Sequence, residues 1–160
     1  MPSLFNMAEP VCRLLKDRGQ TVAVSESAAG GLVSAALLSV PGASDYYLGG
    51  ASIYTQTARR GLLRFNDEKA RQRGSTEEYA TLTAATMRNL LESDWAIGES
   101  GAAGPSGNRY GDPAGHVALA VVGPESATRI LQTGNDDRED NMWVFAQAAL
   151  DLLYDTVKAN

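Results

Sequence analysis

The stretch over residues 21–31, with the sequence TVAVSESAAGG, constrains the fold more than any other part of this chain. It predicts a buried strand over residues 21–24, a polar turn, and a helix over residues 32–38 after the Gly30-Gly31 pair. A strand that leads through such a turn into a helix leaves unpaired backbone N–H groups and a partial positive charge at one point. Anions bind at such points, although Ser25 or Ser27 can also serve only as a helix cap.

Length and composition exclude several classes of protein. With 160 residues, 44% of them hydrophobic, we expect a single domain over residues 1–160 with a substantial core. A formal net charge of −5 disfavours a nucleic-acid-binding face, which requires clustered Lys and Arg. The single cysteine, Cys12, can form no internal disulfide, and we see neither a signal peptide nor a membrane-spanning run. We therefore expect a cytoplasmic protein that binds neither nucleic acid nor membranes.

The remaining hydrophobic pattern alternates helices and strands in the first half and ends in a hairpin. Helices are expected over residues 3–18, 58–63, 76–91 and 138–157, and further strands over residues 51–55, 95–100, 116–122 and 128–133. This order predicts an α/β fold, a three-layer-like sandwich whose mixed sheet is flanked by helices. Loops at the carboxyl ends of strands form a common site in such folds. The loops after Val24, Tyr54 and Ser100 fulfil this condition.

The longest glycine-rich loop spans residues 101–113 and follows a predicted buried strand. Backbone N–H groups over residues 101–104 can bind a phosphate or the oxyanion of an acyl-transfer intermediate. The same residues can instead form a tight surface turn, and Arg109 near the tip can contact an anion or only water. The length of the loop and its position after a strand favour a binding role.

Taken together, these motifs resemble the C-terminal domain of the CinA (competence-damage-inducible) family, whose free-standing members include nicotinamide-nucleotide amidohydrolases. The matching segments follow the family's order over nearly the whole chain. They are residues 25–27 with Gly30 and Gly31, residues 40–44, Tyr46 with Gly49 and Gly50 before Tyr54, and residues 100–105, 113–115 and 134–138.

The resemblance implies a hydrolase without metal or cofactor that converts nicotinamide mononucleotide to nicotinate mononucleotide and ammonia. It further implies a small-molecule nucleotide substrate and a homo-oligomer. Ser27 corresponds to the nucleophile, Tyr54 to an aligning tyrosine, and Arg59 occupies the position of the family's base lysine. The substrate-binding residues that we expect are Glu26, Gly30, Gly31, Ser100, Gly101, Ala102, Gly104 and Arg109.

Arg59 is the main departure from the family pattern. A lysine whose pKa is lowered by burial can accept the proton of a serine hydroxyl. A guanidinium stays protonated and offers no lone pair, and the loss of a positioned base typically slows a reaction by about 10²–10⁴-fold. In the same turn, Ala28 and Ala29 replace a cysteine-like residue and a threonine, and Met142 replaces a basic residue near the end of the chain.

Other side chains offer alternatives for the base. His116 is either a base or a partly exposed histidine at a strand end, and Glu26 is either a site residue or a structural carboxylate bonded to backbone N–H groups. Lys69 lies in a charged segment that we expect to be solvated, and Tyr54 beside Arg59 offers a tyrosine-based route.

The aromatic residues Tyr46, Tyr47 and Tyr110 can stack on a pyridine ring or pack at a subunit contact. Two functions remain open from the sequence. One is a serine amidohydrolase, and the other is a homologue that keeps the pocket and binds a nucleotide without catalysis.

Overall fold

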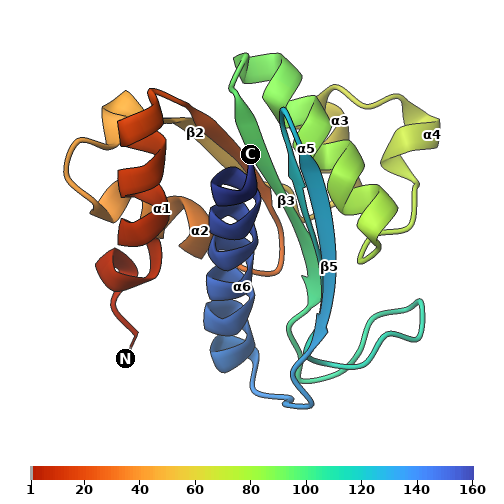
Figure 1. The fold of residues 1–160 in the computed structure, drawn as a ribbon. Coiled ribbons are helices and arrows are strands. Elements are labelled where there is room, and N and C mark those ends of the chain that lie inside the picture. The colour runs from red at the N-terminus through yellow and green to blue at the C-terminus, as the bar shows by residue number, and fades with distance from the viewer. Residues whose placement is uncertain (1) are drawn as a thin grey trace.

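The computed structural model describes residues 2–160 and has a five-stranded mixed sheet between two layers of helices (Figure 1). The strand order is β2-β1-β3-β4-β5. β1 runs parallel to β2 and β3, whereas β4 is antiparallel to β3 and β5. The strands are β1 (Val22–Glu26), β2 (Tyr47–Ser52), β3 (Trp95–Ala102), β4 (His116–Val122) and β5 (Ser126–Gln132). The predicted three-layer α/β sandwich is confirmed.

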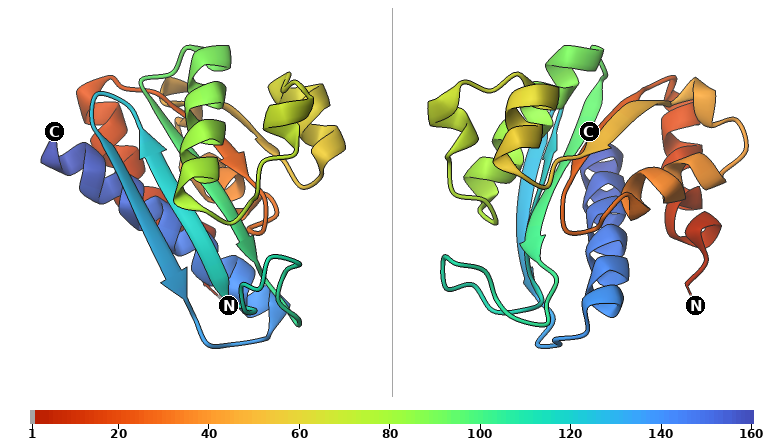
Figure 2. Two further views of the ribbon diagram at one scale, coloured as in Figure 1. Left: turned by 90° about the vertical axis from the view of Figure 1, so that its right-hand side faces the viewer. Right: turned by 180° about the vertical axis from the view of Figure 1, so that it is seen from behind.

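Helices cover both faces of the sheet. The two layers lie on opposite sides of the strands in Figure 1 and in both views of Figure 2. One layer contains α1 (Leu4–Arg18), α2 (Leu32–Ser39) and α6 (Arg138–Ala159), and the other contains α3 (Gln56–Leu63), α4 (Asp67–Ala70) and α5 (Glu77–Leu91). A short 3₁₀ helix, η1 (Ala43–Asp45), precedes β2. None of the helices within residues 2–160 combines the length and the apolar character needed to cross a membrane.

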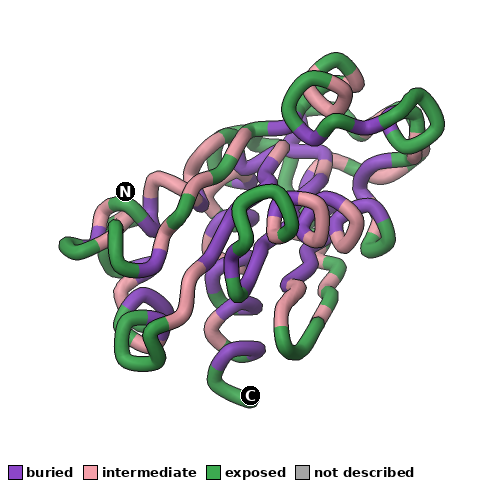
Figure 3. The backbone as a smooth tube through the Cα atoms, turned by 90° about the horizontal axis from the view of Figure 1, so that it is seen from above, coloured by how far each residue is buried: buried purple, intermediate pink, exposed green. Residues whose placement is uncertain are grey.

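The position of the core follows from the helices that cover both faces of the sheet. A sheet buried on both faces needs nearly continuous apolar strands, and the first six residues of both β3 and β4 are buried. Buried backbone stretches gather in the middle of the molecule when it is seen from above (Figure 3). Gly98 in β3 has no room for a side chain, because a Cβ there would lie 1.9 Å from the Ala80 carbonyl oxygen. α5 therefore packs directly on the backbone of β3.

Local signals set most helix ends. Thr76 caps α5 by accepting a hydrogen bond from the Tyr79 N–H, as the sequence predicts, and Gly19 ends α1 in the left-handed conformation at φ 62°. The helix expected over residues 58–63 begins earlier, at Gln56, because Thr55 is its cap. Val144 of α6 is 42% exposed.

The strand predicted over residues 51–55 lies earlier in the structure, as β2. β2 is an edge strand that pairs only with β1, so its residues alternate between half-buried and exposed and show no apolar run. Gly50 is required there, because a Cβ would lie 2.8 Å from the Val24 carbonyl oxygen. Sequence periodicity is weak in such a strand.

The three parallel strands end at the same edge of the sheet. β1 ends at Glu26, β2 at Ser52 and β3 at Ala102, and the loops that follow them lie next to the start of α6 (Figure 2). This arrangement gathers the loops after β1, β2 and β3 at one place, as the sequence analysis expects.

Candidate active site

A cavity of about 480 Å³ lies at this edge of the sheet. The turn after β1, the segment from β2 into α3, the chain before α5, the end of β3 and the glycine-rich loop all contribute to its wall. Seven of the residues selected from the sequence line it: Ser27, Tyr54, Arg59, Ser100, Gly101, Arg109 and Tyr110. A smaller cavity of about 260 Å³ shares Tyr54 and Gly101 with it, and Ala102 and Gly104 line this second cavity.

Ser27 stands on the turn between β1 and α2 and is half-buried. Its N–H donates to Glu99 Oε2 at 2.8 Å, and the Ala29 N–H donates to the same oxygen at 3.0 Å. Gly30 and Gly31 complete the turn in the left-handed conformation, at φ 66° and 99°. The turn is therefore held by a side chain from β3 rather than by bonds within itself alone.

Both carboxylate oxygens of Glu26 accept hydrogen bonds from backbone N–H groups at the start of α2. The residue is 1% exposed, Oε1 accepts from the N–H groups of Gly31 (2.9 Å) and Val33 (3.1 Å), and Oε2 accepts from that of Ser34 (2.9 Å). A carboxylate at a helix N-terminus satisfies the unpaired donors there. Glu26, Gly30 and Gly31, expected to bind substrate, do not line either cavity. They build the turn that carries Ser27.

Glu99 is a buried residue beside Ser27 that sequence reasoning missed. It is 2% exposed, and burial raises the pKa of its carboxyl to about 7, with Glu26 adding to the rise and the N–H groups of Ala29 and Ser27 opposing it. Glu99 Oε1 is buried and has no hydrogen-bond partner among the described residues. The available signal was a single glutamate inside the apolar run of β3.

Arg59 lines the cavity but is bound to the scaffold. Nη1 donates to the carbonyl oxygens of Ala70 (2.9 Å) and Gln72 (2.7 Å), and the guanidinium lies 4.2 Å from the centre of the Tyr79 ring. Gly74 allows this approach, since a Cβ there would lie 3.1 Å from Arg59 Nη2. Arg59 thus fixes the segment between α4 and α5 as one wall of the cavity.

The arginine that contacts Tyr54 is Arg138, not Arg59. Tyr54 is 62% exposed, and its hydroxyl oxygen accepts a hydrogen bond from Arg138 Nη2 at 3.1 Å. Arg138 Nη1 donates to the Gly104 carbonyl oxygen. Arg59, expected beside Tyr54, lines the same cavity but has its hydrogen bonds with Ala70 and Gln72. Tyr54 and Arg138 are 84 positions apart, so no local pattern relates them.

His116 is buried, which corrects the expectation of a partly exposed ring. Its two neighbours define its tautomer: Nε2–H donates to the Ser75 carbonyl oxygen at 2.9 Å, and Nδ1 accepts from the Gln132 amide at 3.3 Å. The ring does not line the cavity of Ser27.

Ser75 connects His116 to the cavity. The Ser75 N–H donates to Ser100 Oγ at 3.0 Å, and Ser75 has a φ of 59°, a left-handed conformation that costs a non-glycine residue about 1–3 kcal/mol. The hydrogen bonds to His116 and Ser100 offset this strain. They place Ser75 and Ser100 side by side in the cavity wall.

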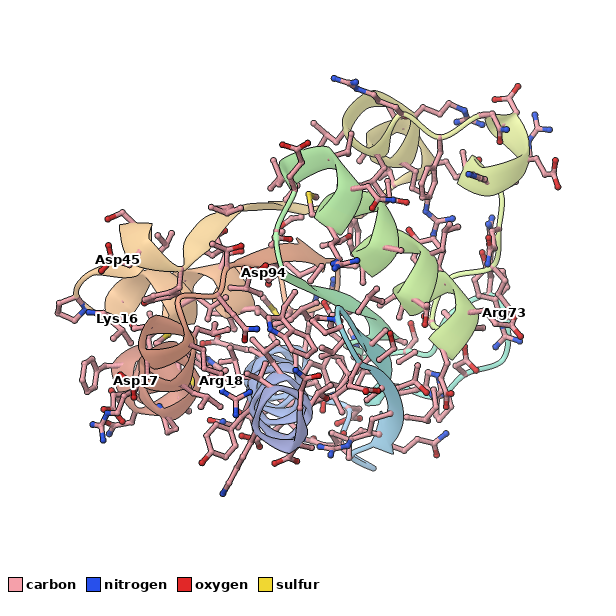
Figure 4. The ribbon with its side chains drawn as sticks, turned by 45° about the horizontal axis from the view of Figure 1, so that its top comes forward. Lys16, Asp17, Arg18, Asp45, Arg73 and Asp94 are labelled. Carbon is pink, nitrogen blue, oxygen red and sulfur yellow. The ribbon has the colours of Figure 1, made fainter. Side chains whose placement is uncertain are left out.

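The glycine-rich loop is attached to the chain before α5. Arg73 contacts both carboxylate oxygens of Asp112, at 2.8 and 2.9 Å, and lies beside the loop in Figure 4. Partial burial raises the pKa of Asp112, but hydrogen bonds from Asn108 and Arg73 outweigh it and leave that pKa below its usual range. At the loop tip, the exposed Arg109 donates to the Tyr110 hydroxyl at 2.9 Å.

Several remaining candidates lie elsewhere. The Tyr46 hydroxyl is buried and donates to the Leu37 carbonyl oxygen at 2.6 Å, and Tyr47 also lies outside both cavities. Lys69 is exposed on α4. Met142 packs on the turn, where a Cβ on Gly30 would lie 2.7 Å from its Cε. Within residues 2–160, no group of three His, Cys, Asp or Glu side chains is arranged to hold a metal ion.

Comparison with known proteins agrees with this architecture. The family description "CinA C-terminal domain" matches residues 4–157. The chain is 34% identical to the CinA-like protein of Synechococcus sp. (strain RCC307) over 149 residues, 92% of this chain and 36% of that protein. It is 40% identical to the CinA-like protein of Prochlorococcus marinus (strain MIT 9313) over 120 residues, 74% of this chain and 28% of that protein. The chain spans about a third of the length of these two relatives.

Solved structures show the same fold at full length. A CinA superfamily protein from Klebsiella pneumoniae superposes with a TM-score of 0.91 at 25% identity, covering 99% of this chain and 100% of that one. A competence/damage inducible protein from Agrobacterium tumefaciens gives a TM-score of 0.86 at 25% identity, covering 96% of this chain and 95% of that one. The fold, the order of the motifs and the extent of the match together show that this chain belongs to the CinA C-terminal domain family.

Proposed function

We propose that this protein is a serine amidohydrolase that converts nicotinamide mononucleotide and water to nicotinate mononucleotide and ammonia. The observation that carries the proposal is the cavity that Ser27, Tyr54 and the end of β3 share. A hydroxyl on a strand-to-helix turn, a polar partner and backbone N–H groups in one cavity are the parts that acyl transfer needs. The resemblance to nicotinamide-nucleotide amidohydrolases supports the choice of substrate.

In the proposed reaction, Ser27 Oγ attacks the carbonyl carbon of the substrate amide. Backbone N–H groups of the glycine-rich loop stabilise the negative oxygen of the tetrahedral intermediate. Ammonia leaves, the substrate acyl group remains bonded to Ser27, and a water molecule hydrolyses that ester to release the carboxylate. Arg109 at the rim of the cavity is placed to attract the anionic phosphate of a nucleotide.

The proton of Ser27 needs an acceptor. Arg59 offers no lone pair, and the nitrogens of His116 are occupied outside the cavity. Tyr54 remains, a cavity residue whose oxygen is held by Arg138. We therefore assign proton transfer to Tyr54. In its phenolate form the oxygen takes the proton of Ser27 and passes it to the amide nitrogen, which leaves as ammonia, while Arg59 positions the cavity wall.

One observation favours a second candidate function. Arg59 occupies the place of the family's base lysine, and its guanidinium is bonded to Ala70 and Gln72. A protein built in this way can keep the cavity and bind a nucleotide without hydrolysing it. A non-catalytic, nucleotide-binding homologue is therefore the alternative.

The experiment that tests both functions is ammonia release from nicotinamide mononucleotide, measured beside calorimetric binding of the same nucleotide. Release that disappears in Ser27→Ala establishes the amidohydrolase. Binding without release by folded protein establishes the alternative. A large gain of activity in Arg59→Lys would show that the arginine has disabled the catalytic step, whereas loss of existing activity would show that it has a role of its own.

A further inference from the structure

Two buried carboxylates, those of Glu26 and Glu99, hold the turn that carries Ser27. They differ in how many of their oxygens accept hydrogen bonds. Glu26 uses both oxygens, for three N–H groups at the start of α2. Glu99 uses only Oε2, for the N–H groups of Ser27 and Ala29, and its Oε1 is buried without a hydrogen bond. The backbone of the nucleophile turn itself is thus bonded to Glu99, which reaches it from β3.

The surroundings of Glu99 contain little to balance its charge. Successive strand residues point to opposite faces, and Gly98 faces α5, so Glu99 points to the side of α2 and α6. Glu26 from the end of β1 is the charged neighbour that acts on it. α2 contains no ionisable residue, β4 places Leu119 opposite Glu99, and His116 of β4 is bonded to Ser75 and Gln132.

The start of α6 adds charges that are engaged elsewhere. Arg138 is bonded to Gly104 and Tyr54, and Asp137 caps the helix through the Asp140 N–H. Glu139 is exposed. The carboxylate of Glu99 is therefore stabilised chiefly by the N–H groups of the turn, those of Ser27 and Ala29 with a smaller contribution from that of Ala28.

We propose that Glu99 is a positioning residue of the active site, whose ionised carboxylate fixes the backbone of Ser27 and Ala29 and thereby orients the Ser27 hydroxyl in the cavity. The proposal rests on the proposed function for its consequence in catalysis. Its structural part, the bond between the carboxylate and the turn, does not depend on which reaction the cavity performs.

Protonation of Glu99 weakens its hydrogen bonds with the N–H groups of Ser27 and Ala29. A neutral carboxyl is a weaker acceptor than a carboxylate, and its proton has no acceptor next to Oε1. Because burial brings the pKa of Glu99 to about 7, the change falls in an accessible pH range. Hydrolysis is expected to decline as pH falls below about 7, through kcat rather than KM, because Glu99 contacts the turn and not the substrate.

The direct test is an NMR titration of backbone amide protons between pH 5 and pH 9. In the unmodified protein, the amide protons of Ser27 and Ala29 are expected to shift together with one midpoint near 7, because both are bonded to Glu99 Oε2. In Glu99→Gln this shared step disappears. The matched control is Glu139→Gln, which removes an exposed carboxyl at the start of α6 and leaves the step and its midpoint unchanged.

Kinetics of ammonia release supply the second readout. Glu99→Gln is expected to lower kcat by about 10²-fold, the effect of a misplaced catalytic group, with KM changed by less than about threefold and the decline below pH 7 abolished. An unmodified protein whose Ser27 and Ala29 amides show no common step overturns the proposal, even if Glu99→Gln fails to fold. A common step without any ammonia release overturns the proposed reaction but leaves the carboxylate–turn bond established.

Discussion

Arg138 Nη2 donates a hydrogen bond to the Tyr54 hydroxyl at 3.1 Å and so joins the first residue of α6 to the segment that follows β2. The same guanidinium contacts the Gly104 carbonyl oxygen of the glycine-rich loop. The Arg138 side chain therefore contacts two walls of the smaller cavity. This cavity adjoins the one that Ser27 lines. The family resemblance implies a role for Arg59 beside Tyr54, but the hydrogen bond to Tyr54 comes from Arg138.

Replacement of Arg138 by methionine is expected to lower hydrolysis by about 10–10²-fold, because Tyr54 and Gly104 lose their common partner. Stability is expected to change by less than about 0.5 kcal/mol, since the side chain is exposed and a cation at a helix N-terminus is unfavourable. Steady-state kinetics and urea unfolding of Arg138→Met measure the two effects. Unchanged kinetics would mean that the Tyr54 contact has no part in the reaction.

Tyr54→Phe removes the oxygen to which we assign proton transfer and keeps the ring. Hydrolysis is expected to fall by about 10²–10⁴-fold. The fold should be unaffected, because Tyr54 is 62% exposed. Ammonia release and circular dichroism of the variant check both statements, and an active Tyr54→Phe protein would require a different base.

Gly98 and Gly61 form a matched pair for testing the packing of α5 on the sheet. A Cβ at Gly98 would lie 1.9 Å from the Ala80 carbonyl oxygen, whereas a Cβ at Gly61 in α3 would meet nothing within 4 Å. Gly98→Ala is expected to destabilise the protein by about 4 kcal/mol or more, or to prevent folding. Gly61→Ala should stabilise it by about 0.5–1 kcal/mol through helix propensity. Urea unfolding compares them, and equal stabilities would show that the close contact is relieved by a small shift.

The pH dependence of stability provides a test of the buried state of Glu99. Burial raises its pKa in the folded protein to about 7 from a reference value of 4.5, so the folded state binds this proton more tightly than the unfolded state. The resulting stabilisation is fully present below pH 4.5 and is lost as pH rises through 7. The loss amounts to about 3 kcal/mol.

The measurement for this prediction is the free energy of unfolding of the unmodified protein and of Glu99→Gln at pH 5, 6, 7 and 8. Because glutamine does not titrate, the difference between the two proteins isolates Glu99 from other carboxyls, such as Asp112 with its lowered pKa. The difference should move by about 2.5 kcal/mol in favour of Glu99→Gln from pH 5 to pH 8. A constant difference would show that Glu99 titrates normally.

Sequence patterns identified the elements whose signals are local. β4 was expected over residues 116–122 and is found there, since buried strands are continuously apolar, and α5 begins after Thr76, since the cap and the acidic first turn are adjacent in the chain. β2 was placed too late, because an edge strand with two glycines in contact with the backbone of β1 carries no such pattern.

The same distinction between local signals and contacts distant in the chain applies to the site. The sequence predicts that the loops after Val24, Tyr54 and Ser100 meet, because they follow strands whose ends lie at one edge of the sheet, and the family resemblance selects Ser27 and Tyr54 within them. No local pattern predicts the hydrogen bond between Tyr54 and Arg138 or those between Glu99 and the turn. The bonded residues are 84 and 72 positions apart in the chain. Such contacts depend on the register of strands and the placement of α6, which no local pattern specifies.

The most direct test of the central claim is a quantitative comparison of the unmodified protein with Ser27→Ala on nicotinamide mononucleotide. We predict ammonia and nicotinate mononucleotide in equal amounts from the unmodified protein, and neither product from Ser27→Ala, which remains folded and still binds the nucleotide. Equal rates from the two proteins, or no product from folded protein that binds the nucleotide, would contradict the assignment of Ser27 as the nucleophile of an amidohydrolase.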